Sequence, residues 1–408
     1  MTIVVSRVPN SRWGTRPCQA CSRRLPWSIF RGSRLTTLPV ATPRTSSKDL
    51  WLVSPGYDLA FIIFSSVLLV VPHLFAQVGG LSNVIVDLVV TAFIGGPHLF
   101  ATYTMTFMEP RFRERYRRYT WSALLLPVLV VSLAIYNLTL LVTVFFFWAS
   151  VHVIHQAAYI ADSYRFKDPR GWGHNLARWQ LWSRVIDYGL LMTSLYPIAT
   201  FKFTGAPLVI FGINLSSEGF ETGGRALLFP ELLKVEWLGP LAAFGFIAFL
   251  LAFVAKTVWE WRVALLHVPK TLHMSLAAVL FFVTPALPNL DVAFQGLNVW
   301  HSFQYLAVVL YLNRMRAERG LIGSECVARI SRSGRRLYWM CLLFTLGAAL
   351  AYLLVYGAIV LGGVWAGDPE QQHYFAFYSV VLSALLVHYY FDHFLFLQVD
   401  NVITPRWS

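Results

Sequence analysis

Long apolar runs dominate the chain after residue 50, and charged residues gather in the shorter segments between them. An apolar run of about 20 residues, folded as a helix, matches the thickness of a bilayer's hydrocarbon core. Ten such runs occur, centred near residues 66, 96, 128, 150, 189, 247, 278, 302, 350 and 385. The pattern predicts an all-α, polytopic integral membrane helical bundle with about ten transmembrane helices.

Every second connecting segment is basic. The basic segments are EPRFRERYRR (109–118), RFKDPRGWGHNLAR (165–178), KTVWEWR (256–262) and RMRAERG to RISRSGRR (314–336). Intervening segments such as LPNL (287–290) lack this excess. Because basic loops stay in the cytoplasm, we expect both termini there. The segment from about 201 to 234 contains APLVIFGINL, and a re-entrant or interfacial position for it would change the helix count.

Composition supports the membrane class, since 57% of the 408 residues are hydrophobic and 13% are charged. Residues 1–50 are basic, with no acidic residue before Asp49, and we interpret them as a disordered cytoplasmic tail. A transit peptide or an upstream start codon would give the same composition. The lone Cys18/Cys21 pair lacks a second pair for zinc. Residues 51–408 are expected to form a single transmembrane domain of a bacterial inner membrane or an organellar membrane.

The net charge of +13 comes largely from this tail and from the basic loops. Such loops contact anionic lipid headgroups, so the charge does not indicate a nucleic-acid partner. The expected partners are the lipid bilayer and a lipophilic small molecule. The sequence gives no indication of oligomeric state.

Five histidines share one depth in the predicted topology, between the bilayer centre and the cytoplasmic face: His98, His152, His155, His301 and His388. A single intramembrane histidine is commonly a hydrogen-bonding strut between helices, and His73, His267 and His273 are interpreted so. Ionisable groups at membrane depth are costly and mark functional sites. Convergence of imidazoles from four helices therefore predicts a metal site.

Helical spacing defines which of these groups share a face. His152 and His155 are three residues apart, and His388 and Asp392 are four apart, so each pair lies on one side of its helix. His393 points about 140° away from His388. A helix can thus supply two ligands, or one ligand and a carboxylate that accepts its other ring N–H.

Further polar residues lie close to the histidines in sequence. Asp392 and Asp162 are the candidate carboxylates that fix imidazole tautomers. Gln156 and Gln304 either do the same, orient bound oxygen, or form plain interhelical hydrogen bonds. Imidazole ligands suit iron, copper or zinc, and a nearby carboxylate favours non-haem iron. Haem held by two axial histidines is the less favoured alternative.

Four short segments resemble the histidine-bearing segments of the Brp/Blh-type membrane β-carotene dioxygenases: GGPH (95–98), VIHQAAYIAD (153–162), NVWHS (298–302) and VHYYFD (387–392). The resemblance implies Fe(II), with O₂ as co-substrate, at a site containing His98, His155 and His301. Where the family has a second histidine in the third segment, this chain has Tyr305. His388 or His152 would replace that ligand, or Tyr305 would itself approach the metal.

The sequence thus favours a membrane-embedded non-haem iron oxygenase or dioxygenase that acts on a carotenoid, isoprenoid or acyl chain entering from the lipid. Tyr305 and Asp392 are its candidate catalytic residues. The alternative is a transporter or channel that passes protons or metal ions along the same His/Asp cluster. A complete pathway needs polar groups on the outer side as well, where the sequence offers only Asp87, Asp187 and His73.

Overall fold

Helices form nearly all of the described chain, as the apolar runs predict. The computed structural model describes residues 50–168, 177–216, 221–222, 225–226, 228, 230, 233–287, 290–363 and 369–397. Among these residues, eight helices are long and apolar enough to cross a membrane: Pro55–Gln77, Ile85–Thr104, Arg117–Tyr136, Leu138–Lys167, Leu238–Arg262, Val268–Ala286, Gly334–Gly362 and Gln371–His393. The predicted all-α membrane bundle is confirmed as far as helix content, helix length and apolar composition show it. The predicted tail, with Cys18 and Cys21, lies outside the described residues apart from Leu50.

Two of the ten predicted spans fold as helices that are not among these eight. They are α9 (Ala177–Ser194) and α13 (Leu290–Glu318). The 29 residues of α13 would reach about 43 Å, enough for a bilayer. Its polar side chains Gln295, His301 and Gln304 are buried inside the protein. The polar content that lowers the hydropathy of α13 therefore faces other helices rather than lipid.

The first two spans are helices of mixed geometry. The first comprises α1 (Pro55–Tyr57), the π turn η2 (Asp58–Ile63), the 3₁₀ segment η3 (Phe64–Leu69) and α2 (Val70–Gln77). The second comprises α3 (Asn83–Val90), the π turn η4 (Thr91–Gly95), α4 (Gly96–Ala101) and the 3₁₀ turn η5 (Thr102–Thr104). π turns inside α-helices are frequent at functional sites, and η4 immediately precedes the His98 segment.

The other helices are more regular. They are α5 (Pro110–Arg115), α6 (Arg117–Ser122), α7 (Leu125–Tyr136), α8 (Leu138–Lys167), α10 (Tyr196–Thr204), α11 (Leu238–Arg262), α12 (Val268–Val283), η9 (Thr284–Ala286), α14 (Glu325–Ile330), α15 (Gly334–Gly362) and α16 (Pro369–Leu397). Two short antiparallel hairpins pair β1 (Val209–Ile210) with β2 (Ile213–Asn214) and β3 (Glu221–Thr222) with β4 (Arg225–Ala226).

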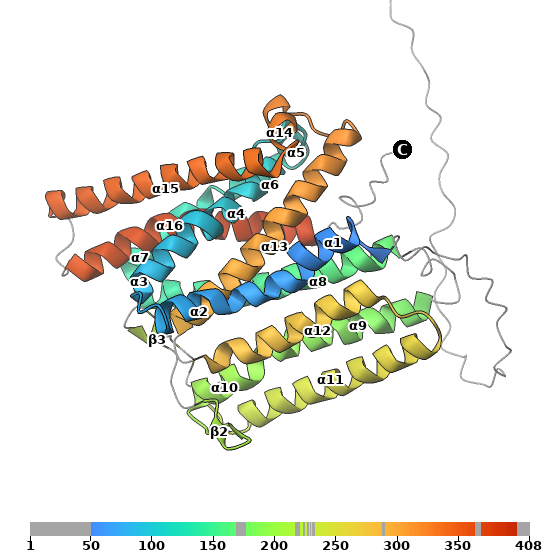
Figure 1. The fold of residues 1–408 in the computed structure, drawn as a ribbon. Helices are drawn as coiled ribbons and strands as arrows, with labels where there is room; N and C mark the ends of the chain where they lie inside the picture. Colours follow the sequence, from blue (N-terminus) through green and yellow to red (C-terminus); the bar gives the residue numbers. More distant parts are fainter. Residues whose placement is uncertain are drawn as a thin grey trace, which may run out of the picture. The chain divides into compact units, whose positions relative to one another are not determined.

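The long helices form two groups with α8 and α13 between them. Figure 1 shows α9, α10, α11 and α12 on one side of α8, and α4, α7, α15 and α16 on the other, with α13 running obliquely past them. One apolar core joins α8, α9, α12 and α13 through residues such as Ile154, Leu190, Ala277 and Trp300. A second joins α7, α8, α15 and α16. Helices from both groups can therefore present side chains to one central point.

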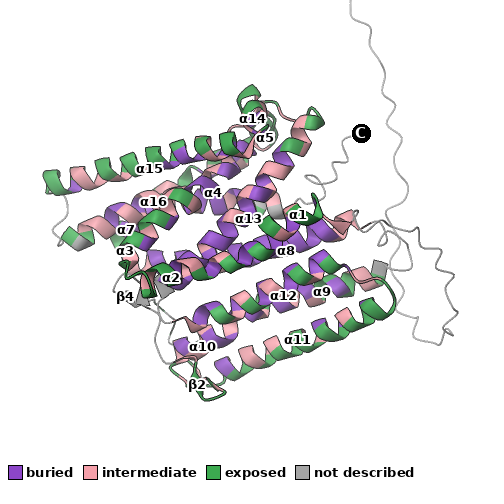
Figure 2. Cartoon of the chain, in the orientation of Figure 1, coloured by how far each residue is buried: buried purple, intermediate pink, exposed green. Residues whose placement is uncertain are grey.

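Apolar side chains also cover much of the outside. Figure 2 shows exposed residues along α11 and α15, and these include Leu251 at 63% and Leu343 at 69% relative exposure. Large exposed apolar faces are unfavourable in water but suit a lipid environment, where packing rather than burial of apolar surface drives helix association. The exposed faces agree with membrane insertion of these helices.

Glycines allow the closest helix contacts near the predicted site. A Cβ on Gly96 would lie 2.2 Å from the Cγ2 of Thr345, and one on Gly296 would lie 2.3 Å from the backbone oxygen of Leu69. Small residues at helix interfaces permit this approach of backbones in membrane proteins. They place α4 against α15, and α13 against η3.

The segment expected to be re-entrant or interfacial, about 201 to 234, contains the last turn of α10 and the hairpin of β1 and β2. Phe211 lies in the hairpin turn with φ of 50° and is fully exposed. Val209 and Ile213 are also exposed. An interfacial position for this apolar hairpin stays a prediction.

Candidate metal centre

The π turn η4 and the helix α4 orient the first imidazole. Nδ1 of His98 lies 3.0 Å from the backbone oxygen of Gly95. A carbonyl oxygen only accepts, so Nδ1 of the neutral ring carries the hydrogen and Nε2 carries a lone pair. The backbone of the turn thereby fixes the tautomer of His98 and directs its lone pair away from η4.

Four histidines from four helices converge around this lone pair. His98 on α4, His152 on α8, His301 on α13 and His388 on α16 each offer one ring nitrogen, and these nitrogens all lie within 4.8 Å of one another. All four side chains are buried, with at most 4% relative exposure. The convergence predicted from the sequence is present, and it joins the two helix groups of the fold.

The distances between ring nitrogens suit a shared metal ion. The Nε2 atom of His301 lies 3.1 Å from that of His98 and 3.2 Å from that of His152. Two nitrogens bound to one ion at about 2.1 Å, at angles of about 90 to 109°, lie roughly 3.0 to 3.4 Å apart. Both observed separations fall in this range.

Hydrogen bonding between the rings accounts for the cluster less well. The Nε2 atom of a neutral imidazole carries at most one hydrogen. Nε2 of His301 meets the lone pair of His98 on one side and Nε2 of His152 on the other. One hydrogen cannot point along both directions, whereas a central cation would bind all of these nitrogens. The donor set therefore fits a metal ion.

A polar network behind His388 fixes the fourth ring. Asp392 Oδ1 accepts hydrogen bonds from Tyr305 Oη at 2.6 Å and from Thr102 Oγ1 at 3.0 Å. Thr102 has only one hydroxyl hydrogen, so it accepts from Nδ1 of His388, at 2.6 Å. This assignment leaves a lone pair on His388 Nε2. All four of these side chains are fully buried or nearly so.

One carboxylate oxygen faces the histidines. Oδ2 of Asp392 lies 3.5 Å from Nε2 of His388 and 3.9 Å from Nε2 of His152. Among the described residues, neither this oxygen nor Nε2 of His388 has a hydrogen-bond partner. Buried polar atoms are rarely left unpaired in native proteins. These two atoms are therefore available to a ligand at the centre of the cluster.

Thr102 belongs to the candidate site, although the sequence reasoning missed it. The prediction had Asp392 or Asp162 accept directly from the second ring nitrogen of His388, but the Thr102 hydroxyl stands between His388 and Asp392. Its position was a usable signal, since Thr102 lies four residues after His98 and so on the same helical face. Tyr305 donates to Asp392, and its Oη lies 2.6 Å from the Thr102 hydroxyl oxygen.

His155 lies outside the four-histidine group, contrary to its prediction as a ligand. Its ring instead lies 5.2 Å, between centroids, from that of His393, which is exposed as expected for a residue pointing elsewhere. His152, one turn earlier on α8, lies opposite His301, with their Nε2 atoms 3.2 Å apart. Its ring stacks on Tyr389 at 4.1 Å between centroids.

Of the three histidines interpreted as struts, His273 joins two helices, whereas the described hydrogen bond of His267 lies within its own helix. His273 Nε2 donates to the backbone oxygen of Ala157 at 3.1 Å and so joins α12 to α8. His267 caps α12 by accepting from the backbone nitrogen of Lys270. His73 is partly exposed on α2 and does not belong to the four-histidine group.

The two glutamines near the site connect helices rather than binding the imidazole rings. Gln156 Nε2 donates to the backbone oxygen of His301 and to Gln304 Oε1, both at 3.1 Å. Gln304 Nε2 donates to the backbone oxygen of Ile62 at 2.6 Å. The chain of contacts ties α8, α13 and η2 together. It supports the interhelical alternative for both residues.

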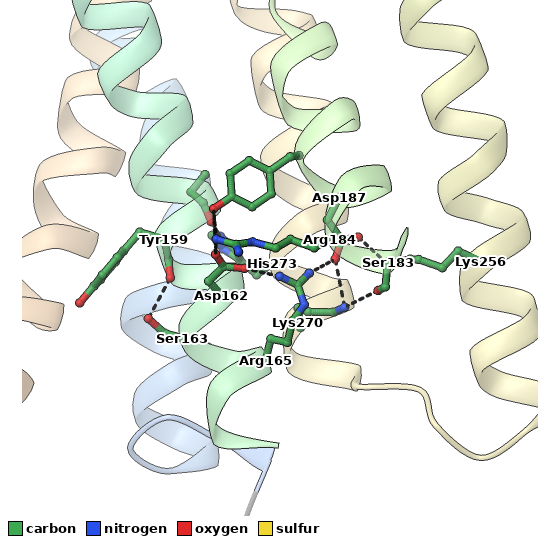
Figure 3. A network of polar contacts seen from close by, with 12 residues as sticks. Tyr159, Asp162, Ser163, Arg165, Ser183, Arg184, Asp187, Lys256, Lys270 and His273 are labelled. Atoms are coloured by element: carbon green, nitrogen blue, oxygen red, sulfur yellow. Dashed lines mark hydrogen bonds and ion pairs between the residues drawn. The ribbon is translucent and has the colours of Figure 1, made fainter. Parts of the chain in front are cut away.

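Asp162 belongs to a separate ionic network and not to the imidazoles. Figure 3 shows it among charged side chains of α8 and α9. It forms ion pairs with Arg165 and Arg184, and Tyr188 Oη donates to it at 2.8 Å. The aspartate is therefore neutralised locally. The expectation that Asp162 orients a metal-bound histidine is wrong.

Asp187 lies in the same network. It pairs with Lys256, with Lys270 at 3.0 Å and with Arg165 at 2.7 Å, as Figure 3 shows. These three cations belong to the ends of α8, α11 and α12 that adjoin the basic loops. Asp187 thus lies at the level of the predicted cytoplasmic side. It does not extend a polar path towards the outer side, as the sequence had suggested.

Comparison of the chain with protein-family models, curated proteins and solved structures gives no significant match.

Proposed function

We propose that this chain is a membrane-embedded non-haem iron oxygenase that acts on a lipophilic substrate. The observation that carries the proposal is the set of four buried imidazoles, with ligand atoms within 4.8 Å, beside an unpaired carboxylate oxygen of Asp392. The proposed ligands are His98, His152, His301 and His388. The short resemblance to the Brp/Blh-type dioxygenases supports iron at His98 and His301, whereas its third implied ligand, His155, lies outside the group.

Iron fits this donor set better than the alternatives. Imidazoles with a neighbouring carboxylate are the ligands of non-haem iron oxygenases, in which Fe(II) with an open position activates O₂. A porphyrin fills the four equatorial positions of its iron, so haem would use at most two of these four imidazoles. A structural zinc site would not need the extra carboxylate oxygen of Asp392 that faces the centre.

The residues around the histidines set proton positions and exclude water. Thr102 accepts the Nδ1 hydrogen of His388, and Tyr305 donates to Oδ1 of Asp392. Only Oδ2 of Asp392 therefore remains available to the centre. Tyr389 covers the face of the His152 ring. Tyr305 occupies the place of the family's second histidine. We assign it a positioning role through Asp392, with His152 and His388 completing the ligand set.

The proposed membrane arrangement is the one that the basic loops predict. We propose ten spans, with α9 and α13 added to the eight apolar helices, and both termini in the cytoplasm of a bacterial cell or the equivalent side of an organellar membrane. The substrate, a carotenoid, isoprenoid or acyl chain, would then reach the buried centre from the lipid.

Metal analysis of the full chain, purified in mild detergent, tests the proposal. We expect stoichiometric iron in the parent, and loss of iron in His98→Ala and His301→Ala. His73→Ala is the matched control, because His73 is partly exposed and outside the group. Equal iron content in all three variants would contradict the assignment of His98 and His301 as iron ligands. Flux of protons or metal ions through liposomes, without retained iron, would favour a transporter instead.

A further inference from the structure

An open groove of about 600 Å³ lies beside the metal centre. Its walls come from α7, α15, α16 and the segment just after α4, including Pro127, Val355, Phe375 and Tyr103. The residues that line it are almost all apolar, and none is charged. The groove therefore suits a hydrocarbon chain and lacks the cation that would hold a lipid phosphate.

The groove leads along α16 towards the four histidines. Val380, Ala384 and Val387 line it, and His388 directly follows Val387, about 100° further around the helix. Val387 and Tyr103, which line its other end, are the sequence neighbours of His388 and Thr102. This end of the groove therefore adjoins the segments that carry His388 and Thr102.

Small side chains on α16 create the space. Ser379, Ser383 and Ala384 lie where a larger side chain would fill the groove. Tyr103 Oη donates to the backbone oxygen of Ala384 at 3.2 Å, which holds the tyrosine against the wall. The opening is therefore a consequence of side-chain size at three positions of a single helix.

Ser379 supplies a polar group within this apolar lining. Its side chain is only 5% exposed, and Oγ has no hydrogen-bond partner among the described residues. Ser383, one turn later, differs because its Oγ donates to the backbone oxygen of Ser379 at 2.5 Å. An unpaired buried hydroxyl is costly, so the Ser379 hydroxyl is suited to a ligand's oxygen.

We propose that the groove binds the apolar chain of the substrate and that Ser379 hydrogen-bonds to one oxygen function on that chain. The substrate is then a lipophilic alcohol or ketone rather than a pure hydrocarbon. Nine residues of helix separate Ser379 from His388, a rise of about 13 Å. Nine residues also rotate the helix by about half a turn, so the oxidised carbon lies at least that far from the recognised oxygen. This inference rests on the proposed oxygenase function.

Binding of a matched pair of probes tests the inference independently of activity. The probes are geranylgeraniol and the hydrocarbon of the same chain without the hydroxyl. Each is titrated into the full chain in lipid nanodiscs, with and without added iron, and tryptophan fluorescence quenching reports binding. One net hydrogen bond corresponds to a preference of about 2- to 12-fold, and we expect the parent to prefer the alcohol by this factor.

The two serines give a matched pair of variants. Ser379→Ala should bind both probes equally, because the unpaired hydroxyl is gone. Ser383→Ala should keep the parent's preference, because its hydroxyl is already bonded to backbone. Equal binding of the two probes by the parent, or an unchanged preference in Ser379→Ala, would overturn the inference.

A third variant tests the groove itself. Ala384→Phe should weaken binding of both probes by at least tenfold, while iron content reports that the four-histidine centre is intact. Undiminished binding in a folded Ala384→Phe protein would place the probes elsewhere and refute the groove. If Ala384→Phe does not fold, the comparison of Ser379→Ala with Ser383→Ala still tests the inference. A preference that persists in a chain that retains no iron would refute the proposed oxygenase while leaving the groove standing.

Discussion

Replacing Thr102 by valine would test the network that orients His388. Valine has nearly the same shape but no hydroxyl, so the change removes the contacts to His388 Nδ1, Tyr305 Oη and Asp392 Oδ1 together. Thr102 is fully buried, so water has no ready access to replace them. His388 Nδ1 would keep its hydrogen without an acceptor. Its ring would no longer be held in the tautomer and the orientation that direct the Nε2 lone pair to the centre.

The expected effect is a weaker metal site in a folded protein. Loss of a group that orients a ligand typically lowers metal affinity about 10- to 100-fold, or about 1.4 to 2.7 kcal/mol. This agrees with about 1 to 3 kcal/mol for leaving a buried donor unpaired. The assay is competition for Fe(II) or Co(II) against a chelator of known affinity, with circular dichroism to confirm helix content.

Thr106→Val is the matched control for this experiment. Thr106 is equally buried one turn later, but its hydroxyl donates to the backbone oxygen of Thr102 and not to the His388 network. We expect it to bind metal like the parent. Thr102→Ser should recover most of the affinity, because it restores the hydroxyl. If Thr102→Val and Thr106→Val bound metal equally well, the orienting role of Thr102 would be refuted.

Three further predictions concern the ligands and the helix packing. His388→Ala should lose retained iron while His393→Ala keeps it, because only His388 belongs to the four-histidine group. If metal analysis showed the reverse, the wrong face of α16 would have been assigned to the site. Asp187→Asn should destabilise the protein by about 3 to 5 kcal/mol, because buried Lys256 and Lys270 lose their counter-charge. Denaturant titration in detergent measures the loss, and the control Glu236→Gln, at an exposed residue, should show no comparable loss. Gly96→Ala should lower the free energy of unfolding by about 1 to 3 kcal/mol, because the added methyl group overpacks against Thr345. Gly347→Ala, whose methyl group meets no described atom within 4 Å, should be nearly neutral. Equal melting temperatures of the two variants would contradict the close α4–α15 contact.

Local spacing was enough to predict the helices and the convergence of four of the histidines. Apolar runs indicated the spans, and the positions of His98, His301 and His388 within them indicated a shared level. The polar α13 shows the limit of this signal. Its glutamines and histidine are hidden by other helices, and hydropathy along one chain does not report what lies opposite a residue.

Spacing did not decide between candidates that share a helical face. His152 and His155 are one turn apart on α8, and only the packing of α8 against α13 and α16 brings His152 to the centre and leaves His155 beside His393. Asp162 likewise was predicted at a suitable depth, but it forms ion pairs with basic side chains of α8 and α9 instead of contacting a histidine of the group. Opposite charges that meet in the fold can lie far apart in sequence.

The sequence by itself therefore determined an all-α membrane bundle with histidines gathered at one level, because residue periodicity and hydropathy fix helix length, face and depth. The tertiary structure decided which four imidazoles meet and that Thr102 links His388 to Asp392. It also opened the groove beside Ser379. These features depend on how closely helices approach at Gly96 and Gly296, on which side chains are small, and on which partner each polar atom finds across the interface.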